Sequence, residues 1–101
     1  MTERRRAVVL CRPDTPGREI GHLAVQYGLD VVYTVFVETE SSKLTALIAG
    51  QHLAEHDAVV LVIPHLTVAR IRHQEYWRAV LAAADVIASD GSIDYRSADR
   101  T

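Results

Sequence analysis

The sequence contains AVVLVI at residues 58–63, followed at once by Pro64. This run is apolar at every position instead of every second position, which is typical of a strand covered on both faces. Proline cannot donate to a strand ladder, so we expect the strand to end at Ile63. Strands of this kind occur almost only in parallel sheets with helices on both sides. The stretch therefore predicts the centre of an α/β fold.

Three further runs predict strands around this one. Residues 7–11 read AVVLC and residues 31–37 read VVYTVFV, and both are rich in strand-favouring residues. Residues 84–89, ADVIAS, predict a fourth strand. After Asp90 the sequence is polar and aperiodic, so from about residue 92 we expect a turn followed by a frayed tail.

The interval between the first two strands has the signals of a helix over residues 16–27. Thr15 is a capping residue, Pro16 fits a first helical position, and Gly28 fits the C-terminal cap. Apolar residues recur between them at helical spacing. We therefore expect this helix to pack against the sheet.

The other two intervals are also predicted to be helical. Ser41 and Ser42 are capping residues for a helix that ends near residues 55–57. The apolar stripe expected on it consists of Leu44, Leu47 and Ile48. A third helix is expected from Thr67 or Val68 onward. Its apolar face is predicted from Tyr76, Trp77, Val80 and Leu81.

Each of these crossovers contains a helix and is long enough for a right-handed connection between parallel strands. We therefore predict one α/β domain over residues 1–101. It should have three layers, with a mostly parallel four-stranded sheet and helices on both faces.

Length and composition narrow the class of protein. The chain has 101 residues, of which 49% are hydrophobic and 24% charged, and this is the balance of one globular domain. The longest apolar run is too short to span a bilayer. A formal charge of −2 and the lack of a basic face argue against stand-alone binding of nucleic acid. Cys11 is the single cysteine, which favours the reducing cytoplasm.

Any ligand site is expected beyond the carboxyl ends of the strands, where ligands bind in open parallel sheets. The residues that follow the predicted strands are polar or charged: Arg12, Asp14, Thr15, Glu38, Glu40, Ser41, Ser42, His65, Thr67 and Asp90. The ligand-binding residues that we predict from this set are Arg12, Asp14, Glu38 and His65.

The segment from about Ala7 to Asp94 resembles the catalytic domain of the serine recombinases, the resolvases and invertases. After its first strand that family has an arginine, a variable residue and the nucleophilic serine. This chain keeps the arginine as Arg12 and has Asp14 at the place of the serine. The order and lengths of the predicted elements also agree with the family.

Two later motifs of the family are retained only in part. An aspartate, two variable residues and Ser-Gly follow its second strand, where this chain has Glu38, Ser41 and a second serine. The family's arginine-rich run after the third strand corresponds to residues 65–70, HLTVAR, which keep only Arg70. The resemblance implies a site at these positions that has lost several of its parts.

The resemblance implies serine attack on a DNA phosphodiester, stabilised by clustered guanidinium groups. A carboxylate at position 14 is repelled by the phosphate that it would have to attack. Ser41 and Ser42 are better explained as helix caps than as substitute nucleophiles. We therefore expect a degenerate site, no catalytic residue, no enzyme activity, no cofactor and no bound metal.

The function expected on these grounds is that of a catalytically inactive resolvase-like module for protein interaction or self-assembly, as a homodimer or with a protein partner, in a DNA-related or regulatory complex. The family's long linking helix and helix-turn-helix module have no counterpart in this sequence, so direct DNA binding would need a partner. One alternative is a regulatory domain that binds a metal ion or a phosphorylated ligand at the strand-end loops. Another is an enzyme that uses Asp14 as nucleophile or general base.

Two patterns are compatible with metal binding. His52 and His56 are four residues apart, the spacing at which two imidazoles can share a metal, but a solvated helix face is the favoured interpretation. Four carboxylates at the predicted sheet edge could hold a hard cation, although turn and capping roles are favoured for them. They are Asp14, Glu38, Glu40 and Asp90.

Two further patterns are also better explained structurally. Arg12 beside the acidic residues is interpreted as an internal counter-ion in preference to a phosphate ligand. Tyr76 and Trp77 lie near Arg72 and Arg78, which would suit nucleic-acid stacking, but core or subunit packing is the favoured role of the two aromatic residues.

Overall fold

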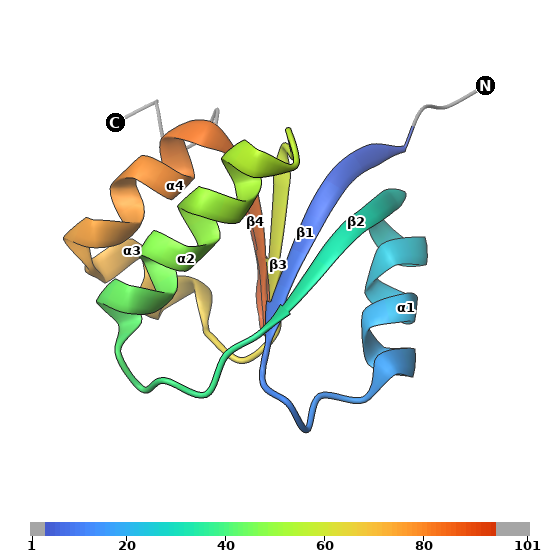
Figure 1. Cartoon of the computed structure of the whole chain (residues 1–101), viewed down its shortest axis with the longest axis horizontal. Helices are drawn as coiled ribbons and strands as arrows, with labels where there is room; N and C mark the ends of the chain where they lie inside the picture. Colours follow the sequence, from blue (N-terminus) through green and yellow to red (C-terminus); the bar gives the residue numbers. More distant parts are fainter. Residues whose placement is uncertain (1–3, 95–101) are drawn as a thin grey trace.

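The structure, a computed structural model, describes residues 4–94 and consists of a five-stranded sheet with helices on both faces (Figure 1). The elements in chain order are β1 (Arg5–Cys11), α1 (Gly17–Tyr27), β2 (Leu29–Phe36), α2 (Ser42–Glu55), β3 (Val60–Ile63), α3 (Val68–His73), the 3-10 helix η1 (Glu75–Trp77), α4 (Arg78–Ala83), β4 (Asp85–Ala88) and β5 (Gly91–Ile93). The strand order is β2-β1-β3-β4-β5. All neighbouring strands are parallel except β4 and β5.

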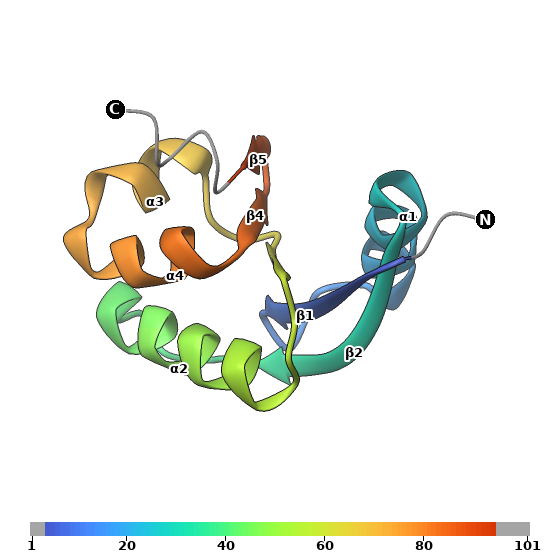
Figure 2. The same ribbon diagram turned by 90° about the horizontal axis from the view of Figure 1, so that it is seen from above.

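The unbroken apolar runs form the centre of the sheet, as predicted. Alternate residues of β1 are buried against opposite layers. Val8 and Leu10 belong to the core beneath α2, η1 and α4, whereas Val9 and Cys11 belong to the core beneath α1. Viewed from above, α1 lies on one side of the sheet and α2, α3 and α4 lie on the other (Figure 2). Strands covered on both faces therefore need apolar residues at every position.

The boundaries of the first strands and helices differ slightly from those predicted. The N-cap of α1 is Pro16, not Thr15, and it makes no side-chain capping hydrogen bond. Gly28 closes α1 in the left-handed conformation (φ 64°), which glycine adopts without steric cost. β2 begins two residues early, at Leu29, and β3 begins only at Val60.

The start of α2 is as predicted. Of its predicted apolar stripe, Ile48 is half-buried and packs against the core, but the other two residues do not. Ser41 caps the helix, because its hydroxyl accepts a hydrogen bond from the backbone N–H of Leu44 (3.2 Å). Leu44 and Leu47 are exposed. The buried residues of the helix are Thr45, Ala46, Ala49 and Leu53. The helix carries apolar residues around most of its circumference, so spacing alone did not identify the face whose small side chains permit close packing on the sheet.

The predicted third helix is divided into α3, η1 and α4. The chain is extended at Gln74 (φ −105°, ψ 124°), which ends α3 at His73. The predicted apolar face is therefore divided between η1, which holds Tyr76 and Trp77, and α4, which holds Val80 and Leu81. Trp77 is fully buried, whereas its neighbour Tyr76 is 39% exposed. Val80 on α4 is also buried, so core packing is confirmed for part of the predicted set.

The sheet has five strands, not four, because a strand forms within the predicted polar tail. β5 pairs antiparallel with β4, and Ile93 is buried beneath the helical layer. The carboxylate of Asp90, in the turn before β5, accepts a hydrogen bond from the backbone N–H of Val68 (2.9 Å). A three-residue strand with one buried side chain has too short a pattern to be recognised. The tail beyond residue 94 lies outside the described residues.

No helix in the described range 4–94 is long and apolar enough to cross a membrane.

Candidate functional site

The carboxyl ends of β1, β2 and β3 meet at a small polar crevice, as expected for an open parallel sheet. It encloses about 30 Å³. Its lining residues are Arg12, Thr39, Glu40, Ser42, Thr45, His65, Leu66 and Arg70. A water molecule needs roughly 10–15 Å³ of such space, so the crevice has room for very few waters and not for a nucleotide.

Arg12 braces the loop between β2 and α2. Its guanidinium donates hydrogen bonds to the carbonyl oxygens of Thr39 (3.0 Å) and Val37 (3.4 Å). It also forms an ion pair with Glu40 (3.3 Å), whose side chain is 91% exposed. A pair so open to solvent contributes little to stability, and the carbonyl contacts are the more important ones. The geometry agrees with the structural interpretation of Arg12.

Two of the predicted ligand-binding residues lie outside the crevice. Asp14 is exposed on the turn after β1, and Glu38 is exposed at the end of β2. Neither residue lines the crevice around Arg12. Asp90 is occupied as the acceptor from Val68. Within residues 4–94, the four acidic residues proposed for a hard cation do not form a metal-binding group.

His65 and Arg70 do line the crevice, at the entrance to the loop after β3 and on α3. Among the described residues, His65 Nδ1 is buried without a hydrogen-bond partner. Burial lowers the pKa of His65, and the positive charge of Arg12 lowers it further, while Glu40 acts in the opposite direction. The crevice therefore favours the neutral imidazole.

These opposing charges predict opposite effects of two substitutions on the pKa of His65. Arg12→Gln is expected to raise this pKa toward the ordinary value of about 6.5, and Glu40→Gln is expected to lower it further. The unfolded chain protonates at a higher pH than the folded protein, so the contribution of His65 to stability is present above about pH 6.5 and is lost as the pH falls toward the lowered pKa. NMR titration of the imidazole measures both shifts. Equal shifts in the same direction would contradict this electrostatic account.

Cys11 is buried at the end of β1. Burial raises the pKa of its thiol, a hydrogen bond with Thr15 partly offsets that effect, and Glu19 adds to the increase. The side chain therefore remains a thiol and packs as a small apolar group, as predicted.

A larger and more open groove of about 420 Å³ was not predicted. It lies between the start of α1 and the ends of β3 and β4. Its lining residues are Pro16, Arg18, Glu19, His22, Leu23, Pro64, Ala88 and Ser89. Segments distant in the sequence form it, so only the arrangement of the sheet reveals it.

His52 lies on α2 and His56 is the C-cap residue of this helix, and the rings of both stack against Tyr33 of β2. Glu55 lies within reach of both histidines. The sequence pattern predicted no third ligand beside the two histidines, and the carboxylate of Glu55, three residues after His52, is the signal for one.

No family model, curated protein or solved structure matches this chain.

Proposed function

We propose that this chain is a catalytically inactive domain that assembles with a second copy through the free edge of β2. The observation that carries the proposal is an eight-residue edge strand with exposed aromatic side chains and a single charge. A distant relationship to the serine recombinase catalytic domain is part of the proposal, and it rests on Arg12, Glu38, Ser41 and Arg70.

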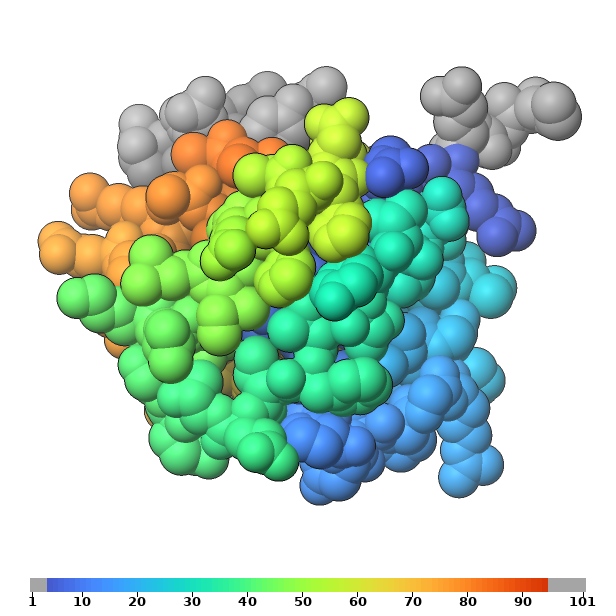
Figure 3. Space-filling model, in the orientation of Figure 1, coloured from blue at the N-terminus to red at the C-terminus, as the bar shows by residue number. Residues whose placement is uncertain are grey.

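The strand order places β2 at one end of the sheet, with β1 as its neighbour on one side only. Figure 3 shows β2 uncovered between α2 and α1 on the face turned to the viewer. Tyr33 is 44% and Phe36 is 59% exposed, and Asp30 is the single charged residue in the strand. A long apolar edge of this kind offers unpaired backbone groups to another strand.

A bulge limits where a second strand can pair. The register with β1 shifts between Ala7 and Val8, whose partners are Val31 and Tyr33, so Val32 is an extra residue. Bulges commonly interrupt pairing at sheet edges. The segment from Tyr33 to Phe36 remains in regular register and is the part suited to strand addition.

A second copy is the partner that this edge fits best. Antiparallel pairing of two β2 strands about a two-fold axis gives both copies the same contacts and closes the assembly at a dimer. The two Asp30 carboxylates then lie at opposite ends of the interface and do not repel each other closely. The aromatic side chains are of the type that stabilises interface centres.

Three features of the strand-end region support the absence of catalysis. Asp14 brings a carboxylate instead of a hydroxyl, and it is exposed. The guanidinium of Arg12 is engaged by two carbonyl oxygens and Glu40. The crevice of about 30 Å³ is too small for a phosphorylated metabolite. These features also favour self-assembly over the alternative of a ligand site in the crevice around Arg12.

Sedimentation equilibrium of the full chain over a range of concentrations tests the proposal. We expect a monomer–dimer equilibrium that Phe36→Lys weakens by about tenfold or more, because lysine on an edge strand opposes pairing and the two-fold axis repeats the charge. Val25→Lys is the matched control. Val25 is 84% exposed but lies on α1, so this variant should dimerise like the parent. A chain that stays monomeric, or equal weakening by both variants, would refute assembly through β2.

A further inference from the structure

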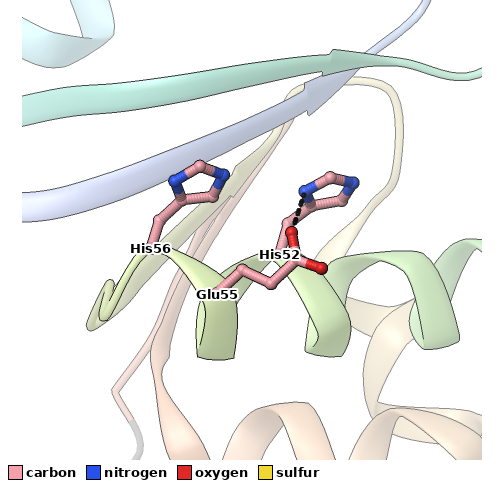
Figure 4. Close-up of side chains that lie close together, drawn as sticks. All are labelled: His52, Glu55 and His56. Atoms are coloured by element: carbon pink, nitrogen blue, oxygen red, sulfur yellow. Dashed lines mark ion pairs between the residues drawn. The ribbon is translucent and has the colours of Figure 1, made fainter.

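Three side chains at the end of α2 form a group with the composition of a metal site. His52 and Glu55 lie in the last turn of α2 and His56 is its C-cap residue, so the three are at positions i, i+3 and i+4 of the helix end. Each offers one ligand atom, and these atoms all lie within 4.8 Å of one another. Figure 4 shows both imidazoles on the same side of the helix and the Glu55 carboxylate directed toward His52. Within the described part of the chain, this is the one group of three potential ligands.

Tyr33 orders the two imidazoles. Its ring stacks on His52 with centroids 5.1 Å apart and on His56 with centroids 4.4 Å apart. The two imidazole planes are consequently within 10° of each other. Holding two flexible side chains in one orientation reduces the entropy that a bound ion would otherwise have to overcome.

The carboxylate is also held in place. Gln51 donates a hydrogen bond to Glu55 Oε1 (3.1 Å), which leaves Oε2 directed at His52. Support of this kind orients the ligands of metal sites. Arg6 donates to the backbone carbonyl of His56 (2.7 and 3.1 Å) and so ties the end of the helix to β1.

The gap between the first two ligands suits an ion better than a direct contact. His52 Nδ1 and Glu55 Oε2 are 3.7 Å apart, and Nδ1 is buried with no hydrogen-bond partner among the described residues. A hydrogen bond would require about 2.7–3.2 Å. Ligands bound at about 2.0–2.2 Å to a tetrahedral ion lie roughly 3.3–3.6 Å from each other. The Glu55 side chain is 51% exposed, so an ion can enter from solvent.

We propose that His52, Glu55 and His56 bind one divalent first-row transition-metal ion of the Zn²⁺ type. Two imidazole nitrogens and one carboxylate oxygen are suited to Zn²⁺, Co²⁺ or Ni²⁺, whereas Mg²⁺ and Ca²⁺ prefer oxygen ligands throughout. Three protein ligands leave at least one coordination position for water or an incoming group. The site is separate from the crevice at Arg12, and none of its three ligands belongs to β2, although Tyr33 of β2 packs on both imidazoles.

Calorimetric titration of the full chain, without any histidine tag, tests this site with ZnCl₂ and with MgCl₂. We expect saturable binding of one Zn²⁺ per chain and no saturable binding of Mg²⁺. His56→Ala should weaken Zn²⁺ binding by about 100-fold and Glu55→Gln by about tenfold. Glu55→Gln changes an exposed side chain and keeps its shape, so its effect does not depend on altered folding.

His22→Ala and His73→Ala are the matched controls, because both residues are exposed histidines on other helices. Both variants should bind Zn²⁺ like the parent, and circular dichroism should show the parent's helical content in every variant. Absence of saturable Zn²⁺ binding overturns the proposal. Equal losses from the control and the ligand variants, or full affinity in Glu55→Gln and His56→Ala, also overturn it.

Discussion

Trp77→Ala is expected to lower the free energy of unfolding by about 3–5 kcal/mol, the usual cost of removing a buried tryptophan. Trp77 is fully buried and is the largest side chain in the core. It lies in η1, among the buried residues beneath α2 and α4. A domain of this length has about 5–15 kcal/mol of stability, so the variant would lose much of the total.

Urea denaturation followed by far-UV circular dichroism measures this loss, and Tyr76→Ala is the matched control. Tyr76 precedes Trp77 but is 39% exposed, so its removal should cost much less, about 1 kcal/mol or below. Equal costs for the two aromatic residues would mean that η1 does not present Trp77 to the core as described.

Leu61→Ala is expected to lower the free energy of unfolding by about 2–5 kcal/mol. Leu61 lies at the middle of β3 with no exposed surface, and β3 pairs with both β1 and β4. The cavity left behind cannot close easily, because the backbone on both sides of the strand is held by hydrogen bonds.

The matched control for Leu61 is Leu47→Ala, at a leucine of α2 that is 62% exposed. Its cost should be within about 0.5 kcal/mol, as for most surface substitutions. The same denaturation experiment measures both variants. A larger loss of unfolding free energy at Leu47 than at Leu61 would indicate that Leu47 packs in the core, as the sequence predicted, and would contradict its exposure in the structure.

The central strands of the sheet were predictable because they need apolar residues at every position, and few other structures require this, whereas β5 was not predicted. The buried face of α2 was not predictable. Its small residues, Ala46 and Ala49, carry less hydrophobic signal than Leu44 and Leu47, although they form the contact with the core. No glycine or proline lies next to Gln74 to mark the end of α3 in the sequence. Tertiary packing determines both the buried face of α2 and the break at Gln74, and the periodicity of apolar residues in the sequence does not show how the elements pack.

The position of the crevice at the strand ends was easier to predict than the residues that line it. Strand order brings the loops after β1, β2 and β3 together, so Arg12, His65 and Arg70 share one crevice. Which side chains turn inward depends on local backbone geometry, and Asp14 and Glu38 turn outward. The spacing of His52 and His56 indicated no third ligand, whereas in the structure Glu55 lies within reach of both.

The two borders of the sheet are unequal in length. β2 has eight residues, whereas β5 has three and runs against the direction of its neighbour. A border as short as β5 offers little backbone for strand addition, which is one way in which natural sheets avoid uncontrolled growth. Once two copies have joined through β2, both outer ends of the combined sheet, within the described residues, are β5 strands. Growth into a filament is therefore disfavoured after the first step.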